Sequence, residues 1–145
     1  MASEEELNRV ANELQLQQQR GEAIRQQMQQ MQASAIEIGS AIDTIENLGK
    51  AKGDALLPIG AGVYVSCPKP NPERVVMNAG ANLLLQKKPE EAIKALKERQ
   101  KRIGDAMESM QKEMGLVVRE IERLTNTASG YAADEERKNV RASKE

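Results

Sequence analysis

The sequence predicts a mainly α-helical protein, a long antiparallel two-helix coiled coil with two β-hairpins inserted between the helices. Two long segments repeat apolar residues at alternating steps of three and four, which is the spacing of a coiled coil. A segment with short β-prone runs bounded by Gly, Pro and Asn separates them. The 145 residues include no Phe, Trp or His, so we expect a thin core without large aromatic side chains.

The first helix is expected at residues 3–49. Ser3 and Glu6 fit a capping box, in which each side chain satisfies a free backbone N–H at the start of a helix. Gly49 is a residue type that commonly ends a helix. Its apolar stripe, interrupted by Gln17 and Gly21, consists of Leu7, Val10, Leu14, Ile24, Met28, Met31, Ala35, Ile38, Ile42 and Ile45.

The second helix is expected at residues 89–132. Pro89 is favoured at the first helical position, and Glu90 and Glu91 suit the positive end of the helix dipole. Residues 133–145 are highly charged and lack periodicity, so we expect a disordered tail. The stripe of this helix consists of Ile93, Leu96, Gln100, Ile103, Met107, Met110, Met114, Val117, Ile121, Leu124, Ala128 and Tyr131.

The two stripes match each other as partners in an antiparallel hairpin. In such a hairpin, the numbers of any two facing residues add up to a constant, and here the constant is 138. Leu14 then faces Leu124, and Ile42 faces Leu96. Because every stripe position finds a partner in this way, the two helices agree in length, phase and end points.

The insert at residues 50–88 is expected to form two β-hairpins. A weak repeat, offset by 20 residues, places Gly-Ala-Gly at 60–62 and Gly-Ala-Asn at 80–82, each followed by an apolar run. Asn82 can replace a turn glycine because Asn tolerates the left-handed backbone conformation better than most residues. The Pro-rich residues 68–72 are expected to be an extended connection between the two hairpins.

The apolar hairpins indicate that the chain assembles with other copies or with a partner subunit. Isolated two-stranded hairpins are marginal in water, and unpaired strand edges pair readily with other strands. The alternative is a private core, in which the hairpins cover apolar residues of their own chain. The candidate interface residues are Leu57, Ile59, Val63, Val65, Val75, Met77, Leu83 and Leu85.

The residue types present do not suggest an enzyme. Without His and with Cys67 as the single cysteine, no catalytic or metal-binding constellation is visible, and no cofactor is expected. The Gly-Ala-Gly turn lacks the third glycine and the following helix of a phosphate loop. The net charge of −1 gives no general attraction to nucleic acid or to an anionic membrane. The acidic N-terminal residues lack a secretory signal, so we expect a cytoplasmic protein.

The insert and its junction with the second helix resemble the prefoldin family, specifically its α-type subunit. The resemblance lies in residues 56–65, in residues 75–87 and in the sequence Lys-Pro-Glu-Glu-Ala-Ile at 88–93. It implies two β-hairpins between two long helices, and an ATP-independent co-chaperone built as a hexamer of two α-type and four β-type subunits. It further implies that the tips of the coiled coil bind unfolded polypeptides and deliver them to a group II chaperonin.

The resemblance places client binding at the tip, where both chain termini lie. Leu16, Leu116 and Val118 lie off the stripe there, and Gln17 and Gly21 weaken it. One alternative is a tip that stays closed, and another is a structural coiled-coil spacer or filament subunit without clients. The candidate client-binding residues are Leu7, Val10, Leu14, Leu16, Leu116, Val118, Leu124, Ala128 and Tyr131.

Overall fold

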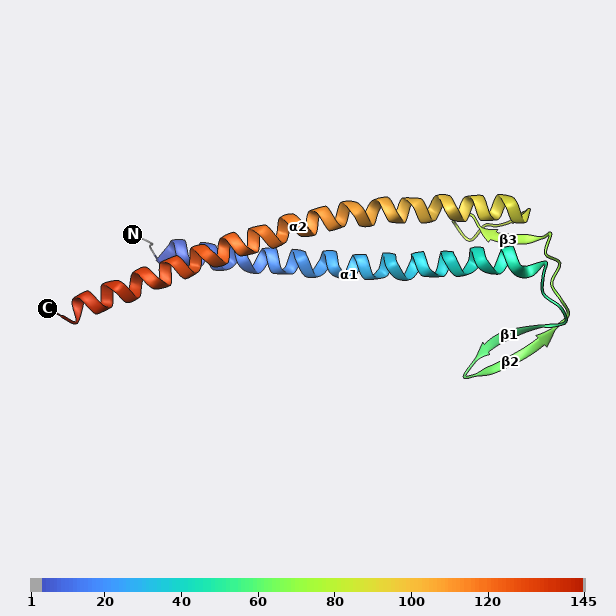
Figure 1. Cartoon of the computed structure of the whole chain (residues 1–145), viewed down its shortest axis with the longest axis horizontal. Helices are drawn as coiled ribbons and strands as arrows, with labels where there is room; N and C mark the ends of the chain where they lie inside the picture. Colours follow the sequence, from blue (N-terminus) through green and yellow to red (C-terminus); the bar gives the residue numbers. More distant parts are fainter. Residues whose placement is uncertain (1–3, 145) are drawn as a thin grey trace. The chain divides into compact units, whose positions relative to one another are not determined.

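The computed structural model describes residues 4–144 and confirms the predicted fold class. Two long helices flank two antiparallel hairpins, each of which is a separate two-stranded sheet (Figure 1). The elements, in chain order, are α1 (Glu4–Leu48), β1 (Ala55–Gly60), β2 (Val63–Cys67), β3 (Val75–Asn78), β4 (Leu84–Lys87) and α2 (Pro89–Ala142).

The chain forms two compact units, and each contains a part of α1 and a part of α2. The first unit comprises the described residues up to Met31 and those from Ala106 onward, and the second is Gln32–Asp105. In the first unit, a Cβ added at Gly21 would lie 3.3 Å from Cγ1 of Val117. In the second unit, Ile42 and Leu96 share one buried cluster. Both pairs agree with the register predicted from the sequence.

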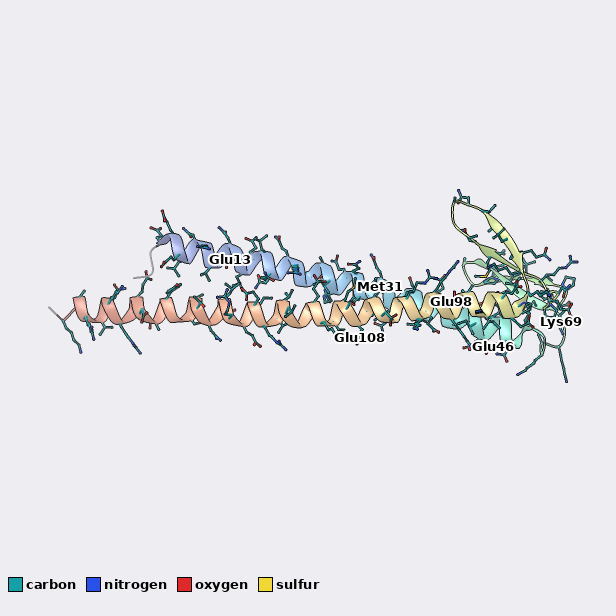
Figure 2. All side chains as sticks on the ribbon, turned by 90° about the horizontal axis from the view of Figure 1, so that it is seen from above. Glu13, Met31, Glu46, Lys69, Glu98 and Glu108 are labelled. Carbon is teal, nitrogen blue, oxygen red and sulfur yellow. The ribbon has the colours of Figure 1, made fainter. Side chains whose placement is uncertain are left out.

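Burial follows the predicted stripes along both helices. Every stripe residue is buried or half-buried except Gln100, which is exposed. Charged residues occupy the outer faces; Glu108, for example, points away from the neighbouring helix (Figure 2). The apolar stripe is therefore what holds α1 and α2 together within each unit.

The helix ends differ from the expected ones in two places. α1 ends at Leu48, one residue before Gly49. Lys69 Nζ donates a hydrogen bond to Gly49 O at 3.4 Å. Ser3 of the expected capping box lies outside the described residues.

The expectation of a disordered tail is wrong for residues 133–142, which continue α2. These residues are mostly strong helix formers, and their lack of periodicity shows only that they face no apolar partner stripe.

The two hairpin turns share one backbone conformation. In the first turn, Gly60, Ala61 and Gly62 have φ angles of 112°, 52° and 76°. The corresponding residues 80–82 have φ angles of 97°, 49° and 59°, and the turn is closed by a 2.9 Å hydrogen bond from Leu83 N to Gly80 O. The 20-residue repeat of the sequence is therefore a repeat of structure, with Asn82 in the left-handed region as expected.

The second hairpin packs against the helices of its own unit. Met77 on β3 is only 9% exposed and lies in a cluster with Ile42, Ala92 and Leu96. Arg99 on α2 adds a hydrogen bond from Nη2 to the Asn78 carbonyl oxygen, at 3.2 Å. The β3 side of one face of this hairpin is thus part of the intrachain core, whereas Leu85, opposite Met77 on β4, stays 41% exposed.

Met77→Ala should destabilise the second unit, because it removes a buried side chain and leaves a cavity between β3 and the helices. Such truncations cost about 2–5 kcal/mol. We expect the midpoint of thermal unfolding, followed by circular dichroism, to fall by about 4 °C or more. The matched control is Val76→Ala, the neighbouring exposed residue, whose midpoint should stay within about 1 °C of the parent. Equal midpoints for both variants would contradict the packing described for Met77.

Candidate functional site

The tip, defined as residues 4–20 and 116–142 of the first unit, has a closed apolar seam. Leu124 is only 1% exposed, which makes it one of the two most buried large side chains among the described residues. The seam is therefore closed around Leu124. The other candidate client-binding residues of the seam are half-buried, namely Leu7, Val10, Leu14, Ala128 and Tyr131.

Three predicted tip residues already face solvent. Leu16 on α1 and Leu116 on α2 are each 63% exposed, and Val118 is also exposed. Each lies one or two positions after a seam residue in the sequence, which turns it away from the partner helix. These residues, together with Val140 near the end of α2, are the exposed large apolar residues of the tip, whereas the half-buried seam residues become fully accessible only if the helices separate.

The seam is not weakened at Gly21, contrary to the expectation from the sequence. Val117 is fully buried there, and its Cγ1 occupies the space beside the glycine. An ion pair between Arg20 Nη2 and Glu113 Oε1, 2.6 Å long, joins the two helices one residue away. Because Gly21 has no side chain, the Val117 side chain of the partner helix fills the space beside it.

The end of α2 extends beyond the start of α1 (Figure 1). In the register of the seam, Glu4 faces Asp134, so residues 135–142 lie beyond the described part of α1. This extension carries the exposed basic residues Arg137, Lys138 and Arg141. Basic residues at a helix C-terminus interact favourably with the helix dipole, which helps these last turns to form.

The hairpins carry the second candidate surface, and the structure divides the predicted interface residues into two groups. Val75 and Met77 pack against the helices, which fits the private-core alternative for these two residues. The other six predicted interface residues are exposed. They are Leu57, Ile59, Val63, Val65, Leu83 and Leu85.

Two long antiparallel helices with two apolar hairpins inserted between them are also found in known proteins. The prefoldin family model, described as a prefoldin subunit, matches residues 5–134 of this chain. The chain belongs to the prefoldin family. Prefoldins are chaperones that form oligomeric complexes.

Curated prefoldin α subunits from archaea are similar to this chain over most of its length. The subunit from Methanobrevibacter smithii is 27% identical over 92% of this chain and 92% of its own length. Those from Methanosarcina mazei and Methanosarcina acetivorans are 30% and 34% identical and cover 86% and 74% of this chain, and 92% and 79% of their own lengths. These relatives agree with the α-type resemblance of the hairpin insert.

A solved prefoldin structure has the same fold. The cryo-EM structure of filamentous prefoldin from Methanocaldococcus jannaschii aligns with a TM-score of 0.68. The alignment covers 78% of this chain and 95% of that one, at 18% sequence identity. At this identity the similarity concerns the fold alone.

Four exposed apolar residues of the prefoldin hairpins were missed by the sequence analysis: Leu56, Tyr64, Val76 and Leu84. Successive residues of a strand point to opposite faces, and only one face of each hairpin was considered. On β3 this choice selected the face that packs on the helices, so the exposed face holds Val76 and Leu84. The alternation itself was the signal that could have found them.

Exposed ion pairs within α1 and α2 lower the pKa values of two carboxyl groups. A hydrogen bond from Arg25 at 2.6 Å lowers the pKa of the Glu22 carboxyl, and Arg123 lowers the pKa of Glu120 in the same way. Both pairs are exposed and stabilise the helices little.

Among residues 4–144, no group of three or more His, Cys, Asp or Glu residues could hold a metal ion. No described helix is long and apolar enough to cross a membrane.

Proposed function

We propose that this chain is the α-type subunit of a prefoldin that binds unfolded polypeptides without ATP and delivers them to a group II chaperonin. Its hairpins join four β-type subunits and a second copy of the chain into a cytoplasmic hexamer, as the resemblance to prefoldins implies. The chain has no catalytic role and needs no cofactor, membrane or nucleic acid. The observation that carries the proposal is the exposed apolar surface of the hairpins in a chain of this chaperone family.

The hairpins are proposed as the assembly region because their surface is unsuited to a monomer in water. Six predicted interface residues and four further apolar residues are exposed within two small sheets. Each sheet has only two strands, so both of its edges carry unpaired backbone groups. Association with other subunits would cover the apolar side chains and pair the edges.

The tip is proposed as the client-binding region. Leu16, Leu116 and Val118 offer separate apolar contacts on its surface, which suits a chaperone that must accept many sequences. The seam residues become accessible when the helix ends fray, since the ends of a helix pair open most easily. Exposed contacts would make the first encounter, and local opening would then enlarge the apolar surface.

A turbidity assay tests this function directly. The chain is assembled with a β-type prefoldin subunit and added to a guanidinium-unfolded protein, such as citrate synthase, as the denaturant is diluted. We expect turbidity to fall in proportion to the assembly added, without ATP. An unrelated two-helix coiled-coil protein of equal mass concentration is the control. Equal turbidity in both samples would contradict the proposed function.

A structural spacer or filament subunit without clients is the second candidate function. The closed seam favours it, because a fully buried Leu124 is what a permanently paired coiled coil requires. The exposed Leu16, Leu116 and Val118 argue for client binding instead. The same turbidity assay separates the two candidates, since a spacer would assemble and yet leave aggregation unchanged.

A further inference from the structure

The two helices pack closely at the inner end of the tip, where Gly21 on α1 meets Val117 on α2. A Cβ added at Gly21 would lie 3.3 Å from Cγ1 of Val117 and 3.8 Å from Sδ of Met114. Val117 is 1% exposed, and Ile24, in the next layer of the seam toward the hairpins, is 6% exposed. Two consecutive layers of the seam are therefore tightly closed at this point.

An ion pair joins the two helices at the same level. Arg20 Nη2 lies 2.6 Å from Glu113 Oε1, and the two side chains are about half exposed. An exposed ion pair stabilises little by itself, but a short and charge-assisted hydrogen bond holds its two partners in one geometry. The ion pair and the Gly21–Val117 contact together form what we call the clamp, defined as Arg20, Gly21, Glu113 and Val117.

The seam is weaker on the tip side of the clamp. Gln17 faces Ile121 in the register of the seam, and both residues are only half-buried. Among the described residues between the clamp and the helix ends, Leu124 alone is buried. An opening that starts at the helix ends therefore passes one strong layer and one layer with a polar residue before it reaches the clamp.

We propose that the clamp limits how far the tip opens, so that the separation of the helices during client binding stops at Gly21. Helix ends open most easily, and each further layer can open only by losing its own buried contacts. Opening past the clamp would break the ion pair and expose Val117 and then Ile24, both of which are buried. This inference rests on the proposed client binding at the tip and adds the point at which the opening ends.

Amide hydrogen exchange tests the clamp on the full-length chain, assembled with a β-type prefoldin subunit and without client. Separated helices should exchange quickly, because a single short helix is marginal in water. In the parent, exchange should be slower by about tenfold or more on the arm side of the clamp than on its tip side. The tip side comprises residues 4–19 and 119–142, and the arm side comprises residues 22–31 and 106–116.

Gly21→Val should accelerate exchange on the arm side by about tenfold or more, because the added methyl groups need the space that Val117 occupies. Exchange on the tip side should change by less than about threefold, since these residues open without the clamp. The matched control is Gly115→Val, which adds the same side chain to α2 at a position where a Cβ would meet nothing within 4 Å. This control should exchange as the parent does.

A milder variant, Glu113→Gln, keeps the size of the side chain and removes the ion pair. We expect exchange on the arm side to accelerate by about two- to fivefold. Unchanged exchange in this variant would overturn the part assigned to the ion pair. Equal acceleration on both sides of the clamp in Gly21→Val, or a parent without a step in exchange at Gly21, would overturn the clamp itself. Either result would leave client binding at the tip standing, because the turbidity assay of the parent tests it separately.

Discussion

Removal of the tip is expected to abolish the suppression of aggregation and to leave the hexamer intact. The variant lacks residues 1–16 and 124–145, so both helices end at nearly the same level of the seam. It loses Leu16 and the candidate client-binding residues of the seam, keeps Leu116 and Val118, and leaves the hairpins unchanged. Turbidity of an aggregating unfolded protein should return to the level without chaperone. The mass from light scattering should correspond to the same number of subunits.

A shorter deletion is the control for tip removal. Deleting residues 135–145 removes only the part of α2 that extends beyond the described start of α1, and it keeps the seam from Leu7 to Tyr131. This variant should suppress aggregation as the parent does. If the longer deletion also kept full activity, clients would have to bind elsewhere, and the assignment of the tip would be wrong.

Leu124→Ala should open the tip more than any other single truncation there, because this leucine is the most deeply buried side chain of the tip seam together with Val117. Truncating a buried leucine costs about 2–5 kcal/mol. A cost of 2 kcal/mol corresponds to an increase of about 30-fold in the open population. Amide hydrogen exchange around Leu14 and Leu124 should therefore accelerate by about that factor or more.

Leu116→Ala is the matched control for Leu124→Ala, since it removes the same side chain from the same helix at a 63% exposed position. Surface truncations usually change stability by less than about 0.5 kcal/mol, so exchange should change by no more than a few-fold. Equal acceleration in the two variants would show that the seam is already open around Leu124.

The seam could be predicted from the sequence because its signal is local and periodic. Leu14 with Leu124 and Ile42 with Leu96 follow from the spacing within each helix and from one constant that relates the two stripes. The turns could be predicted for a similar reason, since the left-handed conformation at residues 60–62 and 80–82 restricts which residues fit. These features depend on neighbours in the sequence or on a repeated pattern.

The faces of the hairpins could not be predicted in the same way. Strand alternation separates Met77 from Val76, but the sequence does not say which of the two faces meets the helices. That choice depends on where the hairpin lies in its unit. The helical end of α2 was missed for another reason. Residues 133–142 have no apolar stripe to indicate a helix, but their residue types favour a helix without a partner.

Native mass spectrometry of the chain, alone and mixed with a β-type prefoldin subunit, tests the central claim most directly. That claim is that apolar hairpins drive a mixed assembly of defined composition. We predict one dominant complex in the mixture, with two copies of this 16.0 kDa chain and four β-type subunits. The chain alone should not give that complex. A mixture in which the two proteins appear only as separate species would contradict the claim.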